Sequence, residues 1–523
     1  MRFISRFRVP SARVLATSIA AAAALTLLAL AGRHVQAATS FTPGNLVVVR
    51  MGDGGAALSS AAAPVFLDEY ATAGGAPVQT VAMPTAVSGA NVRFTDSGSA
   101  SSDGSLNRSA DGRYLTLAGY DADAGTAGVV ASAAARVVAR VSTDGTVDTS
   151  TRLTDGYGAN NIRSAVSDDG SRFWTAGTGA GGGTRVVSLG AGTSLQVSGS
   201  VTNTRIVSIY SGQLYTSSAS GAFQGVSSVG TGLPATSGQA TTILPGFPTA
   251  SGPSSYGFAL LDLNSAVLGV DTAYVADDRS AASGGGLQKW TFNGATWSLA
   301  YTINTGASGA RSVVADTSGA NVVLYATTGE SSANKLVSIA DAGAASAMTT
   351  LAIAGTNKIF RGVAFAPQSG PAITQQPVGT SIVAGQSANL VVVASGTPTL
   401  TYQWYVGTSG DTSSPISGAM SSSFTTPVQN ATGTFNYWVR VANSLGHADS
   451  NTATVTVTAA ALPTITQQPQ SQTINAGNSA ALTVQASSGT PLSYQWFIGV
   501  TGDLTNPVSG AVASSFTTPP LSV

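Results

Sequence analysis

The sequence predicts an all-β protein, and three observations support this prediction. From residue 41 onward, no segment keeps apolar residues at the helical spacing over a dozen positions, whereas short runs rich in Val, Ile, Tyr and Thr recur between Gly, Asp and Ser. Four dipeptides supply the positive φ angles that tight hairpin turns require: Asp111-Gly112, Asp144-Gly145, Asp169-Gly170 and Asn293-Gly294. Two different internal repeats then divide the chain into two β-rich regions.

The first repeat is a short motif that begins with arginine and recurs between residues 108 and 369. Its copies are Arg108-Ser109-Ala110, Arg163-Ser164-Ala165, Arg205-Ile206-Val207, Arg311-Ser312-Val313 and Arg361-Gly362-Val363, and a degenerate copy, Gly257-Phe258-Ala259, fills the gap. The six sites span 361 − 108 = 253 residues in five steps, about 51 residues a step. This period suits a four-stranded blade of a β-propeller, so we predict six blades, with seven as the alternative.

Each earlier copy of the motif is followed by a second strand, such as 113–120 or 172–178, whereas the last copy is followed by none. The missing partners stand at the start of the region. Residues 45–53 read like the other second strands, and 64–70 and 77–84 could supply the third and fourth. We therefore expect the innermost strand at 361–367 to complete the blade begun at 45–84. Such closure removes exposed sheet edges.

The segments RSADGRYLTLAGYDA and RSVVADTSGANVVLYATTG resemble the repeats of bacterial propellers of the lactonase-like and NHL-like kind, over residues 41–369. The resemblance implies that the motif strand lies innermost. The five motif arginines would then stand at equivalent places and could form an anion site at one mouth of the channel: Arg108, Arg163, Arg205, Arg311 and Arg361. The alternative is that each arginine bonds a carbonyl or an aspartate of a neighbouring blade.

The second repeat begins after residue 370 and has a period of 92 residues, which places Trp404 and Trp496 in one register. With its central Trp and later Tyr-x-Val-x-Val pattern, the unit resembles a cysteine-free immunoglobulin-like sandwich. The resemblance implies that Trp404 packs on a contact between Val392 and Val439, at the places where such domains usually carry cysteines, and that Tyr437 forms the tyrosine corner. The second copy stops at a position equivalent to residue 431, so we expect it to lack its F and G strands.

The first 37 residues are predicted to be a secretory signal peptide, because four arginines precede an apolar run at 14–32 and Val35-Gln36-Ala37 suits cleavage. The alternative is an uncleaved anchor, since 19 apolar residues could just span a bilayer. We therefore expect a signal peptide at 1–37, a β-propeller at 41–369, an Ig-like domain at 371–458 and an incomplete one at 463–523. The expected location is extracellular or at the cell surface, with no transmembrane span in the mature chain.

Composition restricts the chemistry. Without cysteine the chain can form neither disulfides nor thiol nucleophiles, and its two histidines, His34 and His447, leave the predicted propeller without an imidazole. Zero net charge and only 9% charged residues argue against nucleic-acid binding. Three acidic pairs could bind calcium, although capping of turns is the alternative: Asp121/Asp123, Asp168/Asp169 and Asp277/Asp278.

These observations favour a monomeric bacterial binding or adhesion protein that has no catalytic residues and needs no cofactor. The propeller would present a platform for an unknown protein or glycan ligand, and the Ig-like modules would act as spacers. The alternative is a secreted lactonase-like or glycan-processing enzyme that uses carboxylates or a metal in the propeller channel. Only two glutamates, Glu69 and Glu330, are available, and neither falls on a predicted innermost strand.

Overall fold

The computed structural model describes residues 39–489 and 491–522, so the predicted signal peptide at 1–37 lies outside the described residues. The prediction of an all-β chain is confirmed, because the described part holds 38 strands and two short 3₁₀ helices, η1 (Val129–Ala131) and η2 (Ala281–Ser283). Neither of these helices has the length or the apolar character needed to cross a membrane. The chain divides after Ser369 into two compact units, which are described separately.

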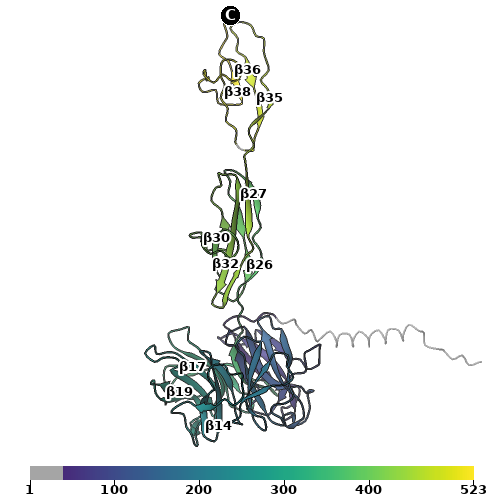
Figure 1. Ribbon diagram of the computed structural model, residues 1–523, viewed down its shortest axis with the longest axis vertical. Coiled ribbons are helices and arrows are strands. Elements are labelled where there is room, and N and C mark those ends of the chain that lie inside the picture. Colours follow the sequence, from purple (N-terminus) through teal and green to yellow (C-terminus); the bar gives the residue numbers. More distant parts are fainter. Residues whose placement is uncertain (1–38, 490, 523) are drawn as a thin grey trace, which may run out of the picture. The chain divides into compact units, whose positions relative to one another are not determined.

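Most strands of the first unit form antiparallel sheets of four in chain order. Figure 1 draws these strands as arrows coloured along the sequence. Four such sheets are β9 (Ile162–Val166) to β12 (Leu195–Ser198), β13 (Val207–Tyr210) to β16 (Thr241–Ile243), β17 (Ser255–Leu261) to β20 (Trp297–Ile303) and β21 (Ala310–Asp316) to β24 (Met348–Ile353). The strands between these ends are β10 (Arg172–Gly177), β11 (Gly183–Ser188), β14 (Gln213–Ser220), β15 (Phe223–Val229), β18 (Thr272–Asp277), β19 (Gly286–Phe292), β22 (Val323–Thr328) and β23 (Lys335–Ala340).

A nine-stranded sheet contains two further groups of four, joined by β4 (Thr95–Ser97). One group is β5 (Leu106–Arg108), β6 (Tyr114–Tyr120), β7 (Arg136–Ser142) and β8 (Val147–Leu153). The other is β25 (Ile359–Phe365), β1 (Leu46–Met51), β2 (Ala62–Tyr70) and β3 (Gln79–Ala82). The predicted pairing of 361–367 with 45–53 is confirmed, since Val363 pairs with Val48 and Phe365 with Leu46.

Most first strands of successive sheets contact one another. Contacts join β25 to β5, β5 to β9, β9 to β13, β17 to β21, and β21 back to β25, while β14 contacts β17. The backbone N–H of Gly362 donates to the carbonyl of Gly104 (2.9 Å), and a Cβ at Gly362 would lie 2.2 Å from the Leu106 nitrogen. Glycine at this position therefore permits the close approach of β25 to the segment before β5.

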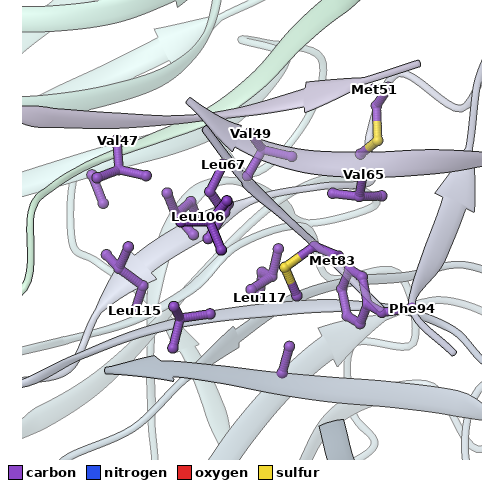
Figure 2. Close-up of a cluster of buried hydrophobic side chains, with 14 of the residues drawn as sticks. Val47, Val49, Met51, Val65, Leu67, Met83, Phe94, Leu106, Leu115 and Leu117 are labelled. Atoms are coloured by element: carbon purple, nitrogen blue, oxygen red, sulfur yellow. The ribbon is translucent and has the colours of Figure 1, made fainter. Parts of the chain in front are cut away.

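Alternation of apolar residues along these strands builds the core between neighbouring sheets. Figure 2 shows one such cluster, in which Val47, Val49 and Met51 of β1 lie with Leu106 of β5 and Leu117 of β6. The hairpin prediction is also confirmed, because the four glycines of the predicted turns all have positive φ: Gly112, Gly145, Gly170 and Gly294.

The second unit begins with a complete sandwich. One sheet contains β27 (Thr380–Val383), β34 (Ala453–Thr458), β32 (Gly433–Asn443), β30 (Thr401–Val406) and β33 (Gly446–Asp449). The facing strands pair as β26 (Ala372–Gln375) with β29 (Val393–Ser395) and β28 (Asn389–Val391) with β31 (Ser423–Thr425). The parallel pair β27–β34 beside antiparallel β34–β32–β30 is the strand arrangement of an Ig-like sandwich.

The predicted core residues of this sandwich lie together. Trp404, Val392 and Val439 belong to one buried cluster, and the indole Nε1 of Trp404 donates to the Ser421 carbonyl (2.9 Å). Tyr437 is the residue predicted to form a tyrosine corner. Its hydroxyl accepts a hydrogen bond at 3.5 Å from Nε2 of the Gln429 side chain, eight residues upstream.

The second repeat reproduces part of this pattern: β35 (Thr464–Gln467) pairs with β37 (Gln485–Ser487), and β36 (Ala481–Thr483) with β38 (Ser515–Thr517). Trp496 lies 5.7 Å from Phe516, as Trp404 lies 5.6 Å from Phe424, and its Nε1 donates to the Ala513 carbonyl. The residues equivalent to β30, 493–498, form no strand in the described chain, and Trp496 is only half-buried.

Candidate functional site

Strand pairing fixes which motif residues are equivalent. Arg108 pairs with Leu115, the third residue of Arg-Tyr-Leu, and Val166 pairs with Trp174, the third residue of Arg-Phe-Trp. Arg108 therefore takes the place of Val166, three residues beyond Arg163. The expectation that all five arginines are equivalent is wrong for Arg108, because the letters Arg-Ser-Ala at 108–110 stand three positions further along their strand than at 163–165.

The same register identifies the residues that share the place of Arg163, which we call the motif position. Ala259 pairs with Tyr274, as Val166 pairs with Trp174, so Tyr256 holds the motif position on β17. The degenerate copy therefore starts one residue earlier than expected. Five residues at the motif position are called the arginine cluster below, although one of them is a tyrosine: Arg163, Arg205, Tyr256, Arg311 and Arg361. Ser105 takes the motif position beside β5.

Three members of the arginine cluster line a small cavity at the beginning of the first strands. The cavity has a volume of about 20 Å³, and Tyr256, Arg311, Arg361 and Asp103 line it. The guanidinium group of Arg205 lies over the Tyr256 ring, 4.0 Å from its centre. Burial lowers the pKa of Arg163, and the charges of Asp103 and Arg205 act on it in opposite directions. The structure thus brings together four of the five predicted arginines.

Three members of the arginine cluster bond groups at neighbouring sheets. Nη1 of Arg163 donates to Asn203 Oδ1 (2.6 Å) and the Thr204 carbonyl (3.0 Å), and Nη1 of Arg205 donates to the Ser255 carbonyl (3.1 Å). Arg311 forms an ion pair with Asp278, with Nε and Oδ2 3.3 Å apart. These bonds follow the alternative interpretation of the motif, in which the arginines connect sheets.

Arg361 differs from the other three. Only 4% of its surface is exposed, its Nη2 donates to the Gly98 carbonyl (3.3 Å), and its Nε and Nη1 have no hydrogen-bond partner among the described residues. Burial, and next the positive charge of Arg311, lower its pKa to about 10. A buried guanidinium group with spare donors is costly unless an anion or a water satisfies it.

Two buried carboxyl groups that the sequence did not indicate stand beside Arg361. Asp103 accepts hydrogen bonds from Asn161 Nδ2 (2.8 Å) and the Tyr120 hydroxyl (2.9 Å), and burial raises its pKa. Burial and the neighbouring Asp103 raise the pKa of Asp96 well above the usual range, and its Oδ2 has no partner in the described structure. Asp96 keeps its proton to a higher pH than an ordinary aspartate, which weakens it as a counter-charge for Arg361.

A larger cavity of about 250 Å³, called the chamber below, lies toward the other end of the same first strands. Its lining includes Asn107, Arg108, Ser208, Tyr210, Phe258 and Phe365, and Ser105, Ile206 and Ser312 line both cavities. No carboxylate is among the described residues that line the chamber. The guanidinium group of Arg108 lies 5.9 Å from the centre of the Phe365 ring.

The acidic pairs proposed for calcium lie beside arginines. Asp121 bonds both Arg93 and Arg152 (2.9 Å each), and Asp277 and Asp278 bond Arg279 and Arg311. Asp168 bonds Arg172, while Asp123 bonds Arg93. Within the described ranges, no group of three or more acidic or histidine side chains is arranged to hold a metal. Calcium binding stays a prediction.

No protein-family model and no curated protein matches the chain. Several solved structures are similar to part of it. Titin domains in complex with telethonin are 21% identical with a TM-score of 0.19, over 29% of this chain and 82% of that chain. The N-terminal Ig1-2 module of the Drosophila receptor protein tyrosine phosphatase DLAR is 21% identical with a TM-score of 0.15, over 29% of this chain and 83% of that chain.

Proposed function

We propose that this chain is a bacterial surface or extracellular binding protein, in which residues 41–369 form a six-bladed β-propeller that holds a ligand by an anionic group. Export follows from the signal peptide expected at 1–37. The Ig-like repeats at 371–458 and 463–523 would act as spacers. A protein or glycan with exposed carboxylate, sulfate or phosphate groups is the expected partner.

Two features support the propeller. The pairing of β25 with β1 joins the two ends of the unit in one four-stranded group. Contacts also run from sheet to sheet, with β14 in place of β13 at the step to β17, and return from β21 to β25. In a propeller, sheets of four strands surround a central channel with their first strands innermost, which accounts for both features.

The unpartnered Nε and Nη1 of Arg361 are the observation that carries the anion site. The cavity beside them has room for about one water-sized group. A single carboxylate or phosphate oxygen could therefore enter while the rest of the ligand stays outside. Four guanidinium groups against three nearby carboxyl groups, Asp96, Asp103 and Asp278, leave an excess of positive charge that attracts such a group.

The lining residues favour binding over carboxylate catalysis. Asp103 is the one carboxylate among the described residues that line the two cavities, and its oxygens already accept hydrogen bonds from Asn161 and Tyr120. Neither glutamate is among the described residues that line the two cavities: Glu69 accepts a hydrogen bond from Asn45 Nδ2 (2.7 Å), and Glu330 lies 3.8 Å from Lys335 Nζ.

Thermal unfolding with and without inorganic phosphate tests the anion site, because a ligand that binds only the folded state raises its stability. Phosphate also stabilises proteins nonspecifically, so the comparison needs a matched variant. Arg113→Gln removes a half-exposed arginine of the same unit, whereas Arg361→Gln removes the buried one. We expect phosphate to raise the melting temperature of wild type and Arg113→Gln more than that of Arg361→Gln. Equal shifts in all three proteins would refute the site.

A further inference from the structure

We infer that the chamber is a second binding site, separate from the arginine cluster, which takes a small aromatic monocarboxylate with its carboxylate on Arg108. This inference does not rest on the anion site at Arg361. It rests on the place of Arg108 in the strand register, on the aromatic lining and on the size of the chamber.

Arg108 is the charged group of the chamber lining, and it forms few hydrogen bonds within the described structure. Its guanidinium group carries five N–H donors, yet the hydrogen bond formed within the described structure runs from Nη1 to the Ala366 carbonyl at 3.4 Å. Burial lowers its pKa, and no described carboxylate forms an ion pair with it. The planar fork of donors matches a carboxylate.

Several other polar side chains of the chamber form hydrogen bonds within the chain. The Ser208 hydroxyl donates to Asn107 Oδ1 (2.9 Å), and the Tyr210 hydroxyl donates to the Phe258 carbonyl (2.6 Å). Arg108 is therefore the one charged group that a ligand meets among the described residues of the chamber lining. A single cation without a second positive group beside it favours a monoanion over a phosphate dianion.

The apolar lining suits a flat ring. Tyr210, Phe258 and Phe365 contribute aromatic surface, and Tyr210 and Phe365 stay partly exposed although they are large and apolar. Solvent therefore reaches the chamber. Benzene fills an apolar cavity of about 150 Å³, so a chamber of about 250 Å³ accommodates a phenyl ring with a short carboxylate arm.

Calorimetric titration of the whole chain with phenylacetate, and with its neutral analogue phenylacetamide, tests the inference. We expect wild type to bind phenylacetate about tenfold more tightly than phenylacetamide, since a hydrogen bond to a charged group is worth roughly 1.5–3 kcal/mol. Arg108→Gln should abolish this difference and leave phenylacetamide binding unchanged. Absence of saturable phenylacetate binding by wild type, or a preference that survives in Arg108→Gln, would overturn the inference.

Three further variants locate the site. Arg152→Gln removes a half-exposed arginine on β8, away from the chamber lining, and should bind like wild type. Ala110 is exposed and lines the chamber, so Ala110→Trp should block both ligands. Unchanged binding in Ala110→Trp would place the ligand outside the chamber and overturn the inference. Arg361→Gln should still bind phenylacetate, which separates this site from the anion site of the proposed function.

Discussion

Arg361 donates a hydrogen bond from Nη2 to the carbonyl oxygen of Gly98, at 3.3 Å, and leaves two more buried nitrogens without a partner among the described residues. Arg50 shows the contrasting case: its guanidinium group holds the buried carboxylate of Asp68 with two hydrogen bonds, of 2.5 and 3.1 Å. The two arginines differ in how well the folded chain satisfies them. This difference leads to the first prediction.

Arg361→Met should leave the free energy of unfolding unchanged or raise it by up to about 2 kcal/mol, because replacing a poorly paired buried charge by an apolar group is often neutral or stabilising. Arg50→Met should instead lower it by about 3 kcal/mol, since it leaves Asp68 buried without its partner. Urea unfolding without added phosphate measures both. A loss in Arg361→Met as large as that in Arg50→Met would mean that Arg361 is fully paired.

Asp96 should make stability fall as the pH rises. Its pKa is raised in the folded state, so above the ordinary aspartate pKa of 3.8 the unfolded chain loses its proton while the folded chain keeps it. The resulting loss is roughly 1.4 kcal/mol per pH unit for one proton, and it ends where Asp96 itself ionises in the folded state. Asp96→Asn should reduce this slope, while Asp103, whose pKa burial also raises, should keep part of it.

Asp144 supplies a control of opposite sign for the pH experiment. A hydrogen bond from the Ser142 hydroxyl lowers its pKa. The stability that this hydrogen bond contributes is therefore present above pH 3.8 and is lost as the pH falls through the lowered pKa.

Unfolding measured from pH 3 to 7 should show Asp96→Asn gaining stability relative to wild type as the pH rises. A parallel pH profile for Asp96→Asn and wild type would contradict the burial of Asp96.

Gly362→Ala should destabilise the first unit by about 2 kcal/mol, because overpacking where the chain cannot relax costs roughly 1–3 kcal/mol. The added Cβ would lie 2.2 Å from the backbone nitrogen of Leu106. Gly158 is exposed, has no atom within 4 Å of a built Cβ and does not need a positive φ, so Gly158→Ala should be neutral or slightly stabilising. Equal effects in the two variants would show that β25 does not approach β5 so closely.

Val392 and Val439 share a buried cluster with Trp404, at the places where Ig-like domains usually carry cysteines. The double variant Val392→Cys/Val439→Cys should form a disulfide and raise the stability of the first sandwich by about 3 kcal/mol. Val391 is 41% exposed and lies on the opposite face of the strand. Val391→Cys/Val439→Cys should therefore stay reduced, as mass measured after thiol alkylation would show.

Sequence periodicity predicted the strand pairing well where each strand is followed by an Asp-Gly turn. The pairing of 361–367 with 45–53 was predicted because the first unit offered an unpaired strand at each end. The equivalence of Arg108 with Arg163 was wrong, because the matching letters Arg-Ser-Ala recur three positions out of register. Counting back from the turns, Ser109-x-Asp111-Gly112 and Ser167-x-Asp169-Gly170, gives the register that the pairing shows.

Two parts of the candidate site gave no usable sequence signal. Asp96 and Asp103 lie among serines and glycines, a setting typical of turns, and only the fold buries them beside Arg361. Tyr256 holds the motif position with a ring in place of a guanidinium group, so a search for arginine passes over it. Burial and charge at a position depend on what the other sheets bring to it, and a repeat motif does not contain that information.

Crystals of the chain soaked in bromide and measured by anomalous diffraction would test the central claim most directly, because bromide is a compact anion that its own scattering identifies. We predict a bromide ion within hydrogen-bonding distance of Nε or Nη1 of Arg361, in the cavity beside Tyr256 and Arg311. A crystal structure in which both nitrogens donate to protein groups, with no bromide beside them, would contradict the account.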